Sequence, residues 1–125
     1  MHDVTEGGVL GAILEMAQAS GCGVCIDSEA LPIGEAQRQI TALFRIDPRF
    51  CVGAGSMVMA VQKGKEDALL KHLQASHIKA TVVGEFASKD EGHIIIENGE
   101  EHPLLFSGRD PYWEAFFKAY NANWT

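Results

Sequence analysis

Residues 2–20 read HDVTEGGVLGAILEMAQAS, and this stretch decides how the rest of the chain is interpreted. Behind its two glycines, apolar residues recur three and four positions apart, a spacing that places them on one face of a helix. Gly21 follows the last helical position and suits the left-handed residue that commonly ends a helix. The sequence therefore predicts an amphipathic helix that begins directly after the glycines and ends at Ser20-Gly21.

Helical and strand patterns alternate along the rest of the chain. The uninterrupted apolar run Met57–Val61 predicts a central strand covered on both faces, and Asn98-Gly99 predicts a hairpin turn. This order indicates one α/β (α+β layered) domain over residues 1–125, with a mixed β-sheet flanked by helices. We expect further strands at 23–27, 80–86, 94–96 and 102–106, and further helices at 33–44, 65–76 and from Asp110-Pro111 onward.

The spacing of apolar residues also predicts which helix faces are buried. Two of the helices should each turn one apolar stripe inward: Ile33, Ala36, Ile40, Leu43 and Phe44 in the second, and Leu69 and Leu73 in the third. The last helix is rich in aromatic residues, which could dock in the core or form a partner surface, and helical spacing favours the core. These aromatic residues are Trp113, Phe116, Phe117, Tyr120 and Trp124.

Charge and apolar content exclude several classes of function. The formal net charge is −7, and the basic residues are dispersed, whereas nucleic-acid binding requires clustered Lys and Arg. No apolar run approaches the length of about 20 residues that a membrane span needs, so we expect a cytoplasmic protein without nucleic-acid or membrane partners.

The cysteines and histidines give little indication of a metal site. Three cysteines cannot form a complete disulfide framework. Cys22 and Cys25 have the C-x-x-C spacing, but they lie on a predicted strand with no second Cys/His pair nearby, which favours a structural role. Four histidines are too scattered to share one metal: His72, His77, His93 and His102.

The segment before the first helix carries the clearest chemical pattern. Two glycines at a helix start allow close approach to the backbone, and free N–H groups there attract anions such as phosphate. Asp3 and Glu6 would repel a bare phosphate, so a bridging Mg²⁺ fits better. Thr5 could cap the helix or bind a phosphate oxygen, and His2 could donate to an anion. The residues alone leave two interpretations open, ordinary helix capping and ligand binding.

This segment resembles the one that opens the second domain of AIR synthase-related proteins, a superfamily of ATP-dependent enzymes that includes a hydrogenase maturation branch. The resemblance begins with His2-Asp3-Val4-Thr5-Glu6-Gly7-Gly8-Val9-Leu10-Gly11-Ala12, continues through Leu31-Pro32-Ile33, Asp47-Pro48 and Gly55–Val61, and extends to Ala80–Glu85. It is nearest to the hydrogenase maturation and uncharacterised branches. The turn Gly53-Ala54-Gly55-Ser56 departs from the serine-rich turn of many relatives.

The resemblance implies the C-terminal domain of an enzyme that uses ATP and Mg²⁺ to phosphorylate an amide-like oxygen of a small substrate. It assigns phosphate or substrate contacts to His2, Asp3, Thr5, Glu6, Gly7 and Gly8, and a metal contact to Asp3. It places most nucleotide ligands on an N-terminal domain of the same parent protein, through which the full-length enzyme would form a homodimer. The isolated domain would be inactive. The alternative is a stand-alone anion-binding or regulatory module, and a third possibility is a purely structural fragment.

Overall fold

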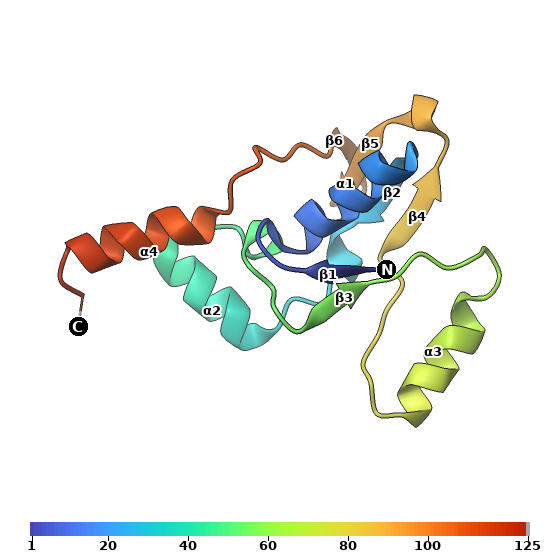
Figure 1. The fold of residues 1–125 in the computed structure, drawn as a ribbon, viewed down its shortest axis with the longest axis horizontal. Coiled ribbons are helices and arrows are strands. Elements are labelled where there is room, and N and C mark those ends of the chain that lie inside the picture. Colours follow the sequence, from blue (N-terminus) through green and yellow to red (C-terminus); the bar gives the residue numbers. More distant parts are fainter. Residues whose placement is uncertain (125) are drawn as a thin grey trace.

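The computed structural model describes residues 1–124, and its centre is a four-stranded mixed sheet (Figure 1). The strands are β2 (Gly23–Asp27), β4 (Gly84–Ala87), β5 (His93–Glu97) and β6 (Glu100–Pro103), in the order β4-β2-β5-β6. β2 runs parallel to β5 and antiparallel to β4, while β5 and β6 form an antiparallel hairpin. The predicted α/β class with a mixed sheet is confirmed.

Helix α1 (Gly8–Ser20) supplies most of the core. It ends, as predicted, at Gly21, whose φ of 64° is left-handed and whose N–H bonds the last carbonyls of the helix. Apolar side chains from α1 pack on β2 and β5 and form one buried cluster: Leu10, Ile13, Leu14, Ala17, Val24, Ile26, Leu31, Ile95 and Leu104. Because α1 is held along most of its length, it is the rigid support for the segment that precedes it.

Helix α2 (Glu35–Phe44) forms close to the predicted position but turns a different face inward. Thr41 is its buried residue, whereas Leu43 is 66% exposed and Ile40 is also exposed. The Thr41 hydroxyl donates to the carbonyl of Gln37 at 2.8 Å, so its burial leaves no polar group unpaired. The predicted inward stripe is wrong for Ala36, Ile40 and Leu43, because Thr41 is satisfied within the helix and takes the inner position. Ile33 does pack against the core, and Phe44 is half-buried.

The predicted central strand at Met57–Val61 is also wrong. β3 covers only Ser56–Val58, and it pairs with β1 (His2–Val4) in a separate two-stranded sheet. Met57 is 52% exposed there. An apolar run can form a buried central strand, or it can lie at a surface that another part of the chain or a partner covers. Periodicity alone does not distinguish these two cases.

Helix α3 (Glu66–Ala75) stands apart from the sheet, joined to it by extended segments on either side (Figure 1). Its bounds agree with the prediction within one residue, but none of its residues is buried, and Leu69 and Leu73 are half-buried. The strand predicted at 80–86 forms only as β4, because the preceding residues belong to the extended segment.

The C-terminal part contains the predicted hairpin and helix. Asn98 and Gly99 have φ values of 52° and 80°, as a type I′ turn requires, although β6 begins and ends earlier than 102–106. Helix α4 (Pro111–Asn121) is capped by Asp110, whose side chain accepts from the N–H of Tyr112. It extends away from the sheet beside α2 (Figure 1), and its aromatic residues are exposed, so the expected core docking is wrong.

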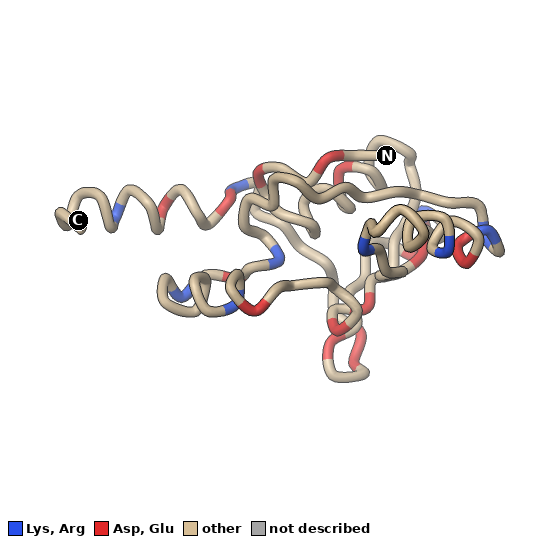
Figure 2. Tube along the Cα trace, turned by 90° about the horizontal axis from the view of Figure 1, so that it is seen from below, with Lys and Arg blue, Asp and Glu red and all other residues tan. Residues whose placement is uncertain are grey.

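Charged residues are spread over the elements. Figure 2 shows Lys and Arg dispersed among Asp and Glu along the chain rather than gathered on a single element. Within residues 1–124, none of the helices is both long and apolar enough to cross a bilayer.

Candidate functional site

The segment that precedes α1 is anchored at both ends. β1 pairs with β3, with His2 opposite Val58 and Val4 opposite Ser56, and Val4 is buried in the core. The backbone carbonyl of Thr5 accepts from the N–H groups of Gly8 and Gly53, at 3.2 and 3.3 Å. The chain therefore enters α1 through a defined turn, not through a loose loop.

Both glycines of this turn are required by the fold. Gly7 and Gly8 have φ values of 84° and 65°, in the region that side chains disfavour. A Cβ on Gly7 would lie 2.7 Å from the ring of Phe106, and one on Gly8 would lie 2.4 Å from the carbonyl oxygen of Arg49. The close approach that the glycines permit is therefore an approach by this chain's own atoms.

One backbone donor of the turn is held by a distant carboxylate. The N–H of Gly7 donates to Oδ2 of Asp110 at 2.9 Å, across 103 positions of sequence. The N–H of Gly8 bonds within the turn, and that of Gly11 donates to the carbonyl of Gly7 at 3.0 Å. Asp110 therefore belongs to the site. Its sequence signal was that of a helix cap, and nothing in its spacing pointed to Gly7.

The polar side chains of the segment fall into two groups. Asp3 and Thr5 are exposed, and strand alternation places Asp3 on the face opposite to His2 and Val4. His2 is engaged by α1, with its Nε2 2.6 Å from Oε2 of Glu15.

Glu6 belongs to the engaged group as well. It accepts from the indole N–H of Trp113 at 3.1 Å. The predicted residues thus share one turn, but only Asp3 and Thr5 present side chains that make no hydrogen bond within the described residues.

The residues fit magnesium only as contributors to a shared site. Among residues 1–124, no three His, Cys, Asp or Glu side chains are grouped as metal ligands. Magnesium in phosphate sites commonly takes one or two carboxylates together with phosphate oxygens and water. The exposed Asp3 carboxylate can supply one such ligand.

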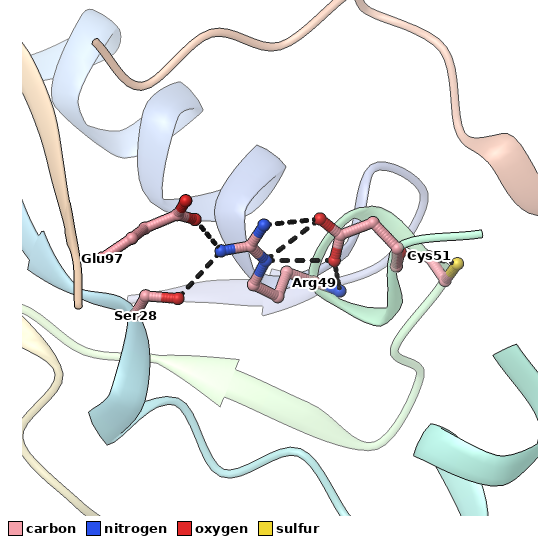
Figure 3. Close-up of polar contacts among 5 residues, drawn as sticks. Ser28, Arg49, Cys51 and Glu97 are labelled. Atoms are coloured by element: carbon pink, nitrogen blue, oxygen red, sulfur yellow. Dashed lines mark hydrogen bonds and ion pairs between the residues drawn. The ribbon is translucent and has the colours of Figure 1, made fainter. Parts of the chain in front are cut away.

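An arginine network fixes the backbone that packs on Gly8. Arg49 lies on the short 3-10 helix η2 (Pro48–Phe50). Its guanidinium donates to both carboxylate oxygens of Asp47, at 2.7 to 3.0 Å, and to the Ser28 hydroxyl at 2.8 Å. It also contacts Glu97 at the end of β5 (Figure 3). Sequence reasoning missed this network, which ties η2 to the sheet and thereby holds its carbonyls against the start of α1.

The charges of this network shift the pKa of its members. Burial raises the pKa of the Asp47 carboxyl, but the hydrogen bonds and charge of Arg49 outweigh burial, so the pKa lies below its ordinary value. The pKa of Arg49 is raised, mainly by its hydrogen bonds to Asp47. Both groups therefore stay charged at neutral pH.

Cys51 lies beside the network and is not suited to act as a nucleophile. Its side chain is 5% exposed, and its thiol donates to the carbonyl of Asp47 at 3.0 Å. Burial, followed by the negative charges of Asp110 and Asp47, raises its pKa to about 11. Because the thiolate is the reactive form, this residue serves packing.

Comparison with known proteins points to one family. Residues 1–97 match the model of the AIR synthase related protein, C-terminal domain. A putative hydrogenase expression/formation protein of Methanocaldococcus jannaschii is 32% identical over 99 residues, which are 78% of this chain and 29% of that protein. The carbamoyl dehydratase HypE of Escherichia coli is 30% identical over 71% of this chain and 27% of its own length.

The fold agrees with these sequence relatives. The crystal structure of E. coli HypE, a hydrogenase maturation protein, superposes with a TM-score of 0.76 at 28% identity, over 87% of this chain and 35% of that one. The chain thus spans less than a third of the length of the curated relatives it matches. The chain belongs to the AIR synthase-related family, within its hydrogenase maturation branch, and its residues 1–97 correspond to the C-terminal domain.

Proposed function

We propose that this chain is the C-terminal domain of an ATP-dependent enzyme that activates an amide-like oxygen of a small substrate by phosphorylation. The matched E. coli relative supports an amide-like substrate, because a carbamoyl dehydratase acts on such a group. The observation that carries the proposal is the placement of exposed Asp3 and Thr5 beside the amino end of α1. That helix end carries a partial positive charge that favours phosphate.

The side chains of the turn take complementary roles. Asp3 would hold Mg²⁺, which would neutralise phosphate charge at this place, and the Thr5 hydroxyl would donate to a phosphate oxygen. The proposal also assigns phosphate contacts to the backbone of Gly7 and Gly8, whose N–H groups would have to leave Asp110 and the Thr5 carbonyl. His2 and Glu6 border the substrate. In phosphoryl transfer the protein mainly positions groups and neutralises charge, so one wall of the site can contribute strongly without holding the nucleotide alone.

The rest of the site comes from elsewhere in the parent protein. An N-terminal domain supplies most ATP and Mg²⁺ ligands and the homodimer contact, and residues 1–125 act as one domain that closes over it. Isolated, the chain is inactive. Two features support a missing partner. The chain covers less than a third of its relatives' length, and Met57, which pairs with Asp3 of β1, is exposed.

The test uses the two-domain parent. Asp3→Asn should lower kcat/KM for ATP-dependent turnover by about a hundredfold, the scale expected when one contact to the transition-state charge is removed. Asp90→Asn is the matched control, because Asp90 is an exposed acid outside the turn, and it should leave turnover unchanged. Equal kinetics for wild type and Asp3→Asn, with both proteins folded, would remove Asp3 from the site.

A further inference from the structure

Helix α4 contacts the proposed phosphate-binding turn through two hydrogen bonds. Oδ2 of Asp110 accepts from the N–H of Gly7 at 2.9 Å, and the indole of Trp113 donates to Oε1 of Glu6 at 3.1 Å. These residues lie beyond residue 97, where the match to the family domain ends. Two consecutive residues of the turn are therefore held by one turn of a helix that the family model does not include.

The same carboxylate has two tasks. Oδ1 of Asp110 caps α4 by accepting from the N–H of Tyr112 at 2.8 Å, while Oδ2 accepts from the N–H of Gly7. A carboxylate oxygen and a phosphate oxygen are the same kind of acceptor for a backbone N–H, and both are anionic. A phosphate oxygen cannot bond the Gly7 N–H while Asp110 occupies it.

Little else holds α4 in place. None of its residues is buried, and an open cavity of about 640 Å³ separates its first turns from α2. Just beyond its end, the ring of Trp124 contacts that of Phe44 on α2, with the centroids 5.6 Å apart. Because few apolar contacts would be lost, α4 can leave the turn at low cost in free energy.

We propose that α4 is an autoinhibitory strap, in which Asp110 occupies the phosphate position at Gly7 and Trp113 engages the Glu6 carboxylate. Phosphate binding at the turn and docking of α4 exclude each other. The strap rests on the proposed phosphate site and regulates it. The apparent affinity of the turn for phosphate is then its intrinsic affinity multiplied by the fraction of molecules in which α4 is undocked.

The experiment titrates the ¹⁵N-labelled chain with Mg-tripolyphosphate and follows the backbone amides of Gly7 and Gly8 together with the indole N–H of Trp113. Asp110→Ala should bind about five- to tenfold more tightly than wild type, because the competing carboxylate is gone. In wild type, the Trp113 indole resonance should shift together with the glycine amides as α4 leaves. Asp110→Ala also removes the cap of α4. Weakening the helix frees the turn in the same direction, so tighter binding is still expected.

Two further variants complete the test. Glu114→Ala removes one acid from the same helix without touching the turn, and should bind like wild type. Trp113→Phe keeps the ring but removes the donor to Glu6, and should tighten binding by a smaller factor. It also provides the test if Asp110→Ala fails to fold.

The outcomes separate the strap from the site. Equal or weaker binding by Asp110→Ala than by wild type would overturn the strap and leave the phosphate site standing. No binding by any variant at millimolar ligand would overturn a phosphate site held by this chain alone, and the strap with it, while Asp3→Asn in the two-domain parent tests the shared site separately.

Discussion

Helices α1 and α3 differ sharply in how the fold uses them, although both carry apolar residues at helical spacing. Seven residues of α1 are buried, and it packs against β2 and β5. No residue of α3 is buried, and it stands away from the sheet (Figure 1). The difference teaches that helical spacing predicts a helix, while burial depends on whether a complementary surface lies within the same chain.

The composition of the two helices explains part of this difference. α1 has small or apolar residues on most of its circumference, and such a helix is stable only when it is surrounded. α3 has a narrow stripe of leucines among charged and polar residues, so it can remain folded with that stripe only partly covered. The following predictions test whether the packed and peripheral regions differ energetically as they do structurally.

The largest contrast should come from removing a leucine in each helix. Leu10 is fully buried, so Leu10→Ala should lower the free energy of unfolding by about 3–5 kcal/mol through lost burial and the cavity left behind. Leu70→Ala in α3 should cost about 1 kcal/mol or less. Urea denaturation measures both, and similar costs for the two variants would contradict the distinction between core and periphery.

The two ends of α1 offer a matched pair of glycines. Gly8 and Gly21 have nearly equal φ values of 65° and 64°, but a Cβ on Gly8 meets backbone carbonyls and one on Gly21 meets open space. Gly8→Ala should cost about 2–4 kcal/mol, from left-handed strain and overpacking together. Gly21→Ala should cost about 1 kcal/mol from strain alone. Equal losses of stability in thermal unfolding would show that the contact with η2 is not restrictive.

The Arg49 network should contribute less to the free energy of unfolding than these packing contacts, and its contribution should depend on pH. Arg49→Ala leaves the half-buried carboxylates of Asp47 and Glu97 without their partner and should cost about 1–3 kcal/mol at pH 7. Lys71→Ala on exposed α3 is the control and should be nearly neutral.

The pH dependence of this effect follows from the lowered pKa of Asp47. Its folded pKa lies below the unfolded value of about 3.9, so the unfolded state binds more protons in that window. The stabilisation is fully present above about pH 5 and is lost as the pH falls through the folded pKa. Arg49→Ala should therefore destabilise less at pH 3 than at pH 7, and a constant difference would contradict the assignment.

The smallest effect concerns thiol labelling, which reports burial without changing stability. With a pKa of about 11, only about one Cys51 thiol in a thousand is ionised at pH 8. A thiol-reactive dye should label the half-buried Cys22 in the native chain and reach Cys51 only on unfolding. Mass spectrometry of native and urea-unfolded samples identifies the labelled residues, and rapid native labelling of Cys51 would show that η2 opens.

Sequence-based predictions were correct where a single residue and its neighbours determine the local conformation. The left-handed C-cap at Gly21, the Asn98-Gly99 turn and the Asp110 cap are each determined by a residue and its immediate neighbours, and the structure has all three. Predictions that required a long-range partner were wrong at Met57–Val61, at the inner face of α2 and at the aromatic face of α4.

The sequence by itself determined the class of the fold, the first helix with its cap, and the position of the polar turn at residues 2–8, because these follow from periodicity and local conformational preference. Only the tertiary structure decided what surrounds that turn. The contacts of Asp110 with Gly7, of Trp113 with Glu6 and of Arg49 with Glu97 join residues far apart in the chain. Such pairs arise from packing, and packing depends on the whole chain at once.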